Sequence, residues 1–217
     1  MVNYPSPAIG PVEFIVKSNG NGKRRGRKLP QVLTADEQAR LLAQAEADPV
    51  PSSAIRARAI LRLFLNTGLR ASELINLKVR DIDWTTGDFI VRQGKGGKDR
   101  ALTLSDDDLE LLREYSSSKG PESNDAHVFT SLNGRKPLCG RWLRRWLAKL
   151  GEQAGLNKRC HPHLFRHTLA CDLLAKTNSL KVVQDTLGHE DISTTTIYAR
   201  LVNGEVKNAL KNLRKEK

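Results

Sequence analysis

Apolar residues recur along much of this chain at the three- and four-residue spacing of helices that bury one side. The first such segment begins at Thr34, which is followed three residues later by Glu37 in the pattern of a capping box. Residues 54–67 repeat the helical periodicity, and Gly68 follows them as a stop signal. The other predicted helical segments are 72–78, 105–116, 139–154, 162–176, 179–187 and 193–199, with a weakly amphipathic one at 205–215. Helix therefore dominates the predicted structure.

One region has the signature of strands. Ile82 and Trp84 precede the turn sequence Thr-Thr-Gly-Asp, and the apolar run 89–91 follows it, which is typical of a hairpin. A third short strand is predicted at 101–104, after the glycine-rich turn 94–97. These segments predict a small three-stranded antiparallel sheet with Lys95 on a turn at its edge.

Residues 1–30 show neither period and are rich in Pro, Gly and Asn, so we expect a flexible arm ahead of a single folded domain at 31–217. The arm carries a cluster of basic side chains, namely Lys23, Arg24, Arg25, Arg27 and Lys28. Such a cluster is most often solvated charge; contact with DNA phosphates gains weight only if the folded domain also binds DNA.

The overall charge favours a polyanionic partner. The chain has 36 Lys and Arg against 24 Asp and Glu, a net charge of +12, which makes nucleic acid the leading candidate. Three cysteines and the absence of a secretory signal pattern argue against a disulfide framework and favour a cytoplasmic protein. The apolar runs are too short to predict a membrane span.

Six polar side chains together have the chemistry that cuts a phosphodiester: a hydroxyl, two guanidiniums, an ammonium and two imidazoles. They are Arg70, Lys95, His163, Arg166, His189 and Tyr198. In-line attack places extra negative charge on the nonbridging oxygens of phosphorus, so preorganised cations lower the barrier. A guanidinium grips two oxygens at once and stays charged at physiological pH. We therefore interpret these residues as one site in which a protein hydroxyl attacks DNA.

The spacing of His163 and Arg166 places them at neighbouring positions on one helix face, with Pro162 in the first turn. One helix would then aim both side chains at one phosphate. An imidazole titrates near neutral pH, so His163 is suited to accept the tyrosine proton or to orient the phosphate. His161 and His167 are interpreted as capping or locally hydrogen-bonded histidines.

Residue type alone leaves two alternatives to this site: a zinc site among nearby Cys and His residues, and another tyrosine as the nucleophile. Cys160, His161, His163, His167 and Cys171 crowd into twelve residues at a spacing that permits zinc. No Cys-x-x-Cys pair accompanies them, so we favour a buried apolar role for Cys171 and expect no metal.

Tyr4 and Tyr115 compete with Tyr198 as nucleophiles by residue type, but neither has matching polar surroundings in the sequence.

The segments Thr-Gly-Leu-Arg-Ala-Ser-Glu-Leu, His-Pro-His-Leu-Phe-Arg-His-Thr and Leu-Gly-His-Glu-Asp-Ile-Ser-Thr-Thr-Thr-Ile-Tyr carry a specific resemblance. In order and local spacing they resemble the catalytic domain of tyrosine recombinases, the phage-integrase family, over roughly residues 30–217. The resemblance implies a mainly α (α+β) fold of the DNA breaking-rejoining enzyme type, with the small three-stranded sheet described above. It also implies a tail helix over 204–217 that docks on an adjacent protomer.

The resemblance also implies roles for the candidate residues. Tyr198 matches the nucleophile that joins the DNA 3′-phosphate and releases a 5′-hydroxyl. Arg70 and Arg166 match the arginines that hold the phosphate. Lys95 matches the lysine that protonates the leaving 5′-oxygen, with Lys98 as its rival.

Three further matches complete the implied site. His163 matches the histidine of proton transfer and phosphate positioning, and His189 matches the second histidine, which donates to a nonbridging oxygen. Glu73, three residues after Arg70, matches an acidic residue that supports the site by bracing the guanidinium.

The implied activity is site-specific DNA recombination or integration without metal, nucleotide or other cofactor, because a phosphotyrosine retains the energy of the broken linkage. The implied partners are double-stranded DNA with specific recombination sites and three further copies in a homotetramer, in the cytoplasm with the nucleoid and with no membrane involved. Most family members carry a core-binding domain ahead of the catalytic domain, whereas only about 30 residues precede the first predicted helix here. An excised catalytic domain and a naturally short recombinase like those of fimbrial phase variation both fit.

Two other functions remain open at this point. A type IB topoisomerase uses similar tyrosine, arginine and histidine chemistry to relax supercoils, and a non-catalytic relative would only bind DNA. The small size and the spacing from His189 to Tyr198 favour the recombinase.

Overall fold

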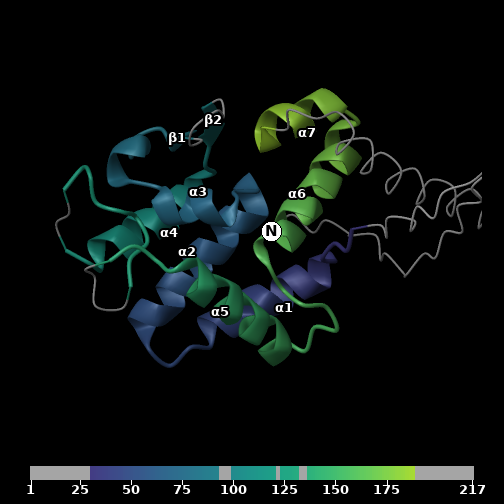
Figure 1. Cartoon of the computed structure of the whole chain (residues 1–217), viewed down its shortest axis with the longest axis horizontal. Helices are drawn as coiled ribbons and strands as arrows, with labels where there is room; N and C mark the ends of the chain where they lie inside the picture. The colour runs from purple at the N-terminus through teal and green to yellow at the C-terminus, as the bar shows by residue number, and fades with distance from the viewer. Residues whose placement is uncertain (1–29, 93–98, 121–122, 132–135, 189–217) are drawn as a thin grey trace, which may run out of the picture.

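The computed structural model describes residues 30–92, 99–120, 123–131 and 136–188. Helices make up most of these ranges, and a two-stranded sheet lies at one end of the helical body (Figure 1). In chain order the elements are α1 (Ala35–Glu46), α2 (Pro51–Thr67), α3 (Ala71–Asn76), the 3-10 turn η1 (Val79–Asp81), β1 (Asp88–Val91), β2 (Arg100–Thr103), α4 (Asp106–Ser117), α5 (Gly140–Gln153), α6 (Pro162–Thr177) and α7 (Leu180–Leu187).

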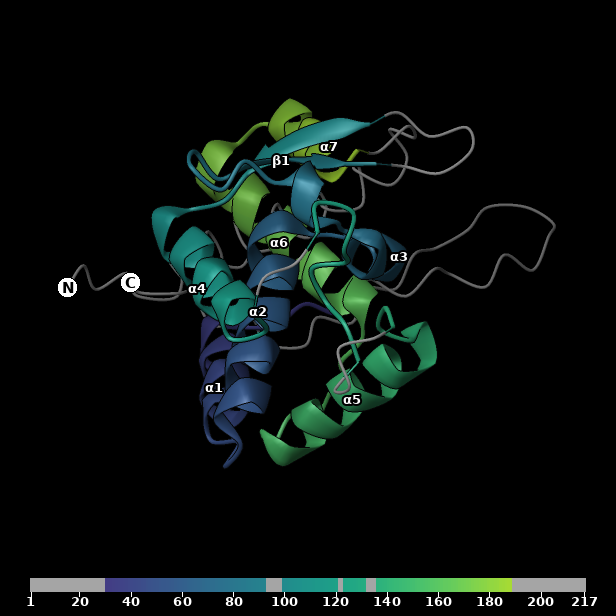
Figure 2. The same cartoon turned by 90° about the vertical axis from the view of Figure 1, so that its left-hand side faces the viewer.

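Helix α2 is the centre of the fold. It packs against α1, α4 and α6, and Figure 2 shows α1 and α4 beside it. Ile60, Leu61 and Phe64 of α2 are almost completely inaccessible to solvent, which is expected of a helix covered on several sides. The Phe64 ring stacks on Phe165 of α6 with ring centroids 5.7 Å apart. This packing places the start of α6 beside the C-terminal half of α2.

The predicted capping box is confirmed. The Thr34 hydroxyl accepts a hydrogen bond from the Glu37 backbone N–H at 3.2 Å, and a Glu37 carboxylate oxygen accepts one from the Thr34 N–H at 2.8 Å. Two N–H groups that have no helical partner are satisfied in this way.

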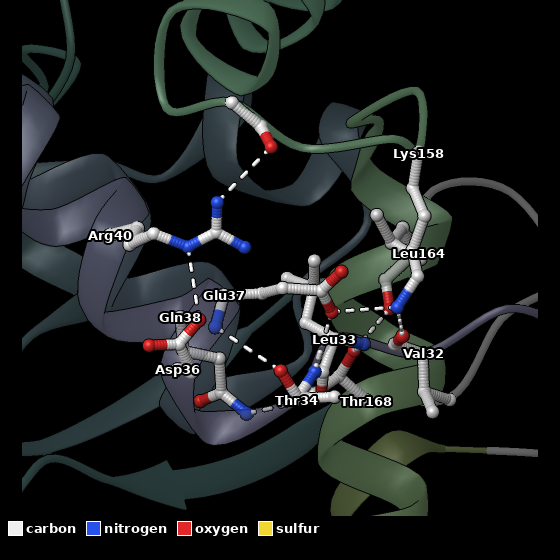
Figure 3. Close-up of polar contacts among 11 residues, drawn as sticks. Val32, Leu33, Thr34, Asp36, Glu37, Gln38, Arg40, Lys158, Leu164 and Thr168 are labelled. Carbon is white, nitrogen blue, oxygen red and sulfur yellow. Dashed lines mark hydrogen bonds and ion pairs between the residues drawn. The ribbon is translucent and has the colours of Figure 1, made fainter. Parts of the chain in front are cut away.

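The segment entering α1 is also fixed to α6 and to the loop before it (Figure 3). The Leu33 N–H donates to Thr168 Oγ1 of α6 at 2.9 Å. The Lys158 ammonium donates to the Val32 carbonyl at 2.7 Å and to the Glu37 carboxylate at 2.6 Å. These contacts join parts of the chain more than a hundred residues apart and hold α6 against the start of the domain.

The small antiparallel sheet is present, with two strands in the described residues where three were expected. β1 pairs with β2 so that Phe89 lies opposite Leu102. Ile82 makes only an isolated bridge to Phe89. The chain before it coils into η1, and the Asp83 side chain accepts the backbone N–H groups of the next turn, so no extended strand forms there.

The predicted helices within the described ranges are all present, with ends shifted by a few residues. The largest shift is at the start of α2, where Pro51 occupies the first turn ahead of the predicted residue 54. In the described ranges no helix is both long and apolar enough to cross a membrane. The predicted arm, apart from Pro30, and the predicted segments 193–199 and 205–215 lie outside the described residues.

Gly68 ends α2 as predicted, in the left-handed conformation with φ at 61°. A Cβ added there would lie 2.6 Å from Leu187 Cδ2 and 3.0 Å from Leu169 Cδ2. Gly68→Ala is therefore expected to lower the free energy of unfolding by about 2–4 kcal/mol, from backbone strain and overpacking together. Urea denaturation followed by circular dichroism measures the loss.

Gly120→Ala is the matched control, because Gly120 has φ at 83° but no atom within 4 Å of an added Cβ. It should lose only the strain of a left-handed alanine, about 1–2 kcal/mol. Equal losses in the two variants would show that the close approach of α6 and α7 to Gly68 adds nothing.

Candidate active site

Arg70 and Glu73 form a compact pair at the start of α3. The Arg70 N–H donates to Glu73 Oε2 at 2.8 Å, and its Nη1 donates to Glu73 Oε1 at 2.7 Å. The Glu73 side chain is 5% exposed, whereas that of Arg70 is 36% exposed. The Arg70 guanidinium is thus held on one side by the buried Glu73 carboxylate and remains accessible to a ligand.

Arg100 of β2 holds the same carboxylate from another direction. Its Nη1 and Nη2 donate to Glu73 Oε1 and Oε2 at 2.9 and 2.8 Å, and its Nε donates to the Thr186 carbonyl of α7 at 3.1 Å. The Arg100 side chain is 7% exposed. No motif marks Arg100 in the sequence; the available signal is an arginine next to an apolar strand, where burial would require a carboxylate partner.

These contacts keep Glu73 ionised. Burial alone would raise the pKa of Glu73, but hydrogen bonds from Arg100 and from the Arg70 backbone N–H, the charge of Arg100 and the hydrogen bond from the Arg70 side chain lower it to about 2. The carboxylate is therefore charged throughout the physiological range and neutralises part of the positive charge around it.

Arg166 lies on α6 and is 4% exposed. Its Nη1 donates to the Gly68 carbonyl at 2.7 Å, and its Nη2 donates to the Leu187 carbonyl. The guanidinium thereby joins the C-terminal ends of α2 and α7. Because Gly68 is two residues before Arg70, the structure brings Arg166, Arg70 and Glu73 together around the turn that follows α2.

Three histidines lie along the first turns of α6. His161 caps the helix, since its Nδ1 accepts the Leu164 N–H at 3.2 Å. This confirms the capping role among the interpretations of His161. His163 is exposed, and its ring centroid lies 6.4 Å from that of His161 and 6.5 Å from that of His167. His163 and Arg166 share α6, but the imidazole faces solvent whereas the guanidinium is buried.

Burial and the neighbouring imidazoles of His163 and His161 lower the pKa of His167 to about 4, so His167 is neutral at physiological pH. The unfolded chain, with an ordinary histidine pKa near 6.5, binds the proton more readily. Stability contributed by neutral His167 is therefore present above about pH 6.5 and is lost progressively as the pH falls toward 4. We expect the melting temperature to drop between pH 7 and pH 5, and to drop less in His167→Gln.

His127→Gln is the control for this measurement, because His127 lies at a bridge with Lys78, outside the α6 cluster. Glu73, with its pKa near 2, contributes its stability above about pH 4.5 and loses it only below that pH, so it does not account for a change between pH 7 and 5. An undiminished drop in His167→Gln would contradict the assignment to His167.

Among the described residues no group of three His, Cys, Asp or Glu side chains is arranged to hold a metal ion, and this includes the histidines and cysteines for which zinc was the alternative. Cys160 and Cys171 are both buried. Burial, with the charge of Glu37, raises the pKa of Cys160 to about 11, which keeps that thiol protonated.

Tyr115 is unsuited to be a nucleophile. It is 3% exposed and stacks on Phe129 with ring centroids 5.3 Å apart, inside the core. Tyr4 lies outside the described residues.

Several predicted site residues also lie outside the described residues: Lys95, Lys98, His189, Tyr198 and the arm residues Lys23, Arg24, Arg25, Arg27 and Lys28. In the sequence, His189 directly follows Gly188, the residue that ends α7. The predicted site residues that the structure describes are Arg70, Glu73, His163 and Arg166. Hydrogen bonds join Arg70 to Glu73 and add Arg100 to this pair, and Arg166 contacts the Gly68 carbonyl beside it.

Residues 31–205 match the family model described as the phage integrase family. The chain belongs to this family. The tyrosine recombinase XerC of Xanthomonas axonopodis pv. citri is 39% identical over 178 residues, which cover 81% of this chain and 55% of XerC. Tyrosine recombinase XerA of Pyrococcus furiosus is 34% identical over 184 residues, covering 85% of this chain and 62% of XerA.

Solved structures of recombinases have the same fold. The post-cleavage complex of the XerH site-specific recombinase with its difH substrate aligns with a TM-score of 0.74 at 28% identity, over 87% of this chain and 55% of XerH. The match confirms both the resemblance and the mainly helical α+β fold. The chain spans little more than half the length of several of the curated relatives that it matches.

Proposed function

We propose that this phage integrase family member is a site-specific DNA recombinase that cuts and rejoins DNA through a 3′-phosphotyrosine on Tyr198. One observation carries the proposal: an accessible Arg70 guanidinium is braced by a buried, ionised Glu73 beside a second arginine, Arg166. Guanidiniums held in fixed positions suit a reaction whose transition state gathers charge on phosphate oxygens.

In the proposed reaction, the Tyr198 oxygen attacks phosphorus, and the bond from phosphorus to the 5′-oxygen breaks. His163 takes the phenolic proton, and Lys95 supplies a proton to the leaving 5′-oxygen. Arg70, Arg166 and His189 donate to the nonbridging oxygens. Positive charge at the phosphate comes from protein side chains, so the step as written requires no metal ion.

Rejoining reverses the same steps. A 5′-hydroxyl attacks the phosphotyrosine, and Tyr198 leaves. The linkage that forms is equal in kind to the one that broke, so no nucleotide is consumed.

We propose double-stranded DNA carrying specific recombination sites as the partner. The net charge of +12 supports a polyanion, and the similar XerH structure is of a recombinase bound to its difH substrate. Four copies acting on two duplexes, in the cytoplasm with the nucleoid, complete the proposal. The basic arm at 1–30 would add sequence-independent phosphate contacts.

A nicked suicide substrate tests the proposal. End-labelled DNA with candidate recombination sites is incubated with the protein in EDTA, without nucleotide, and run on a denaturing gel. Cleavage near the nick releases a short fragment that carries the free 5′-hydroxyl. This fragment diffuses away and cannot reverse the reaction, so a covalent protein–DNA adduct should accumulate. No adduct from protein that binds the same DNA would contradict the assignment. Relaxation of a supercoiled plasmid without strand exchange would instead indicate topoisomerase activity.

A further inference from the structure

Glu73 is shared between two arginines in a regular way. Its Oε1 accepts Nη1 of Arg70 at 2.7 Å and Nη1 of Arg100 at 2.9 Å. Its Oε2 accepts the backbone N–H of Arg70 at 2.8 Å and Nη2 of Arg100 at 2.8 Å. Each oxygen therefore takes one hydrogen bond from each arginine, and the orientation of the carboxylate depends on both.

The two arginines have different environments. The Arg100 side chain is 7% exposed, and its guanidinium donates to the Glu73 carboxylate and the Thr186 carbonyl. The Arg70 side chain is 36% exposed and is open to a ligand. A buried charged pair is stabilised by bidentate geometry of this kind. The plane of the Arg100 guanidinium thus fixes the plane of the Glu73 carboxylate, and the carboxylate in turn orients the guanidinium of Arg70.

Arg100 also reaches the end of α7. Its Nε donates to the Thr186 carbonyl, and Arg166 takes the next carbonyl, that of Leu187. The last carbonyls of a helix have no partner within the helix and attract positive charge. Two guanidiniums, one from β2 and one from α6, therefore hold the end of α7, one residue before Gly188 and two before His189 in the sequence.

We propose that Arg100 is a positioning residue for strand cleavage: through Glu73 it fixes the orientation of Arg70, and through Thr186 it keeps the end of α7 in register with that arginine. The inference rests on the proposed function, because the phosphate that Arg70 would bind is the one that Tyr198 attacks. All three nitrogens of the Arg100 guanidinium already donate to the Glu73 carboxylate or to the Thr186 carbonyl, so Arg100 acts through these contacts and not through DNA. Its effect is therefore expected in the rate of cleavage and not in DNA affinity.

Arg100→Lys separates charge from geometry. A lysine ammonium keeps the positive charge near Glu73 but cannot hold two carboxylate oxygens and the Thr186 carbonyl in a fixed plane. Single-turnover cleavage of the suicide substrate at saturating protein should slow about tenfold to a hundredfold, the usual effect of losing an outer partner of a reacting group. DNA affinity in a mobility-shift assay should stay close to that of the wild type.

Arg62→Lys is the matched control for stability. Arg62 of α2 pairs with Asp108 of α4, a carboxylate that is also buried, at 3% exposed. Arg62→Lys should lower the melting temperature about as much as Arg100→Lys does, while leaving the cleavage rate near that of the wild type. Equal slowing in Arg62→Lys and Arg100→Lys would mean that general destabilisation causes the defect, which would overturn the positioning role.

A double variant tests whether Arg100 acts through Arg70. If it does, Arg100→Lys should slow cleavage much less in an Arg70→Ala background than in the wild type, because the side chain it orients is already absent. The same fold-change in both backgrounds would overturn the proposal.

Should Arg100→Lys not fold, the paired variant Arg100→Met with Glu73→Gln removes both buried charges together and leaves neither unpaired. Slow cleavage by this folded pair supports the proposal, and a wild-type rate overturns it. The wild-type protein shows whether the recombinase assignment fails or only the role of Arg100. If it forms no adduct, the recombinase assignment fails; if it forms one and the Arg100 variants cut equally fast, only the role of Arg100 fails.

Discussion

Tyr198→Phe is expected to abolish the covalent protein–DNA adduct while leaving DNA affinity almost unchanged. The substitution removes one hydroxyl and keeps the aromatic ring, so the chain loses its proposed nucleophile and little else. Tyr115, the one tyrosine in the described ranges, lies in the core at 3% exposed and offers no substitute hydroxyl. A denaturing gel with the suicide substrate measures the adduct, and a mobility shift measures binding.

Tyr115→Phe is the matched control. The ring that stacks on Phe129 is retained, so this variant should fold and should form the adduct at the wild-type rate. An adduct that persists in Tyr198→Phe would refute the assignment of the nucleophile. Loss of the adduct in both variants would show that the effect of Tyr198→Phe is not specific.

Features set by neighbours in the sequence were predictable. The capping box of Thr34 and Glu37 and the helix stop at Gly68 depend on contacts within four residues, and both are present. The contact between Arg70 and Glu73 follows from the same short range, because residues three apart meet at a helix start.

Features set by distant contacts were not predictable from these patterns. Arg166 was assigned to phosphate on residue type and motif, yet its burial against carbonyls of Gly68 and Leu187 depends on how α2, α6 and α7 pack. Arg100 was missed because its partner Glu73 lies 27 residues away on another element. In each case the residue type was visible in the sequence, but the partner was a product of the tertiary fold.

The sheet was also predicted incompletely, here because of local hydrogen bonds that the apolar pattern does not reveal. Alternation around Ile82 and Trp84 predicted a strand, but the Trp84 indole donates to the Val79 carbonyl at 3.1 Å and Asp83 organises a turn. Local hydrogen bonds from side chains competed with pairing and left one bridge. Short strand predictions are sensitive to this competition because few ladder hydrogen bonds oppose it.

Arg70→Ala and Arg166→Ala are both expected to slow strand cleavage by a hundredfold or more, the order of magnitude lost with a preorganised donor to a transition-state oxygen. Their effects on stability should differ. Removing the Arg70 side chain leaves Glu73 with both hydrogen bonds from Arg100 and one from the Arg70 backbone. Arg70→Ala should therefore melt close to the wild type, as expected for a side chain that serves a ligand more than the fold.

Arg166→Ala removes a 4% exposed side chain whose guanidinium satisfies the carbonyls of Gly68 and Leu187. Buried carbonyls that lose their donor, together with the cavity, should lower the free energy of unfolding by about 2–4 kcal/mol. Single-turnover cleavage and urea unfolding, measured on both variants, separate the two roles. A near-normal cleavage rate in either variant would reject its place at the phosphate. Equal stability of the two would contradict the structural role of Arg166, because its guanidinium, unlike that of Arg70, donates to the carbonyls at the ends of α2 and α7.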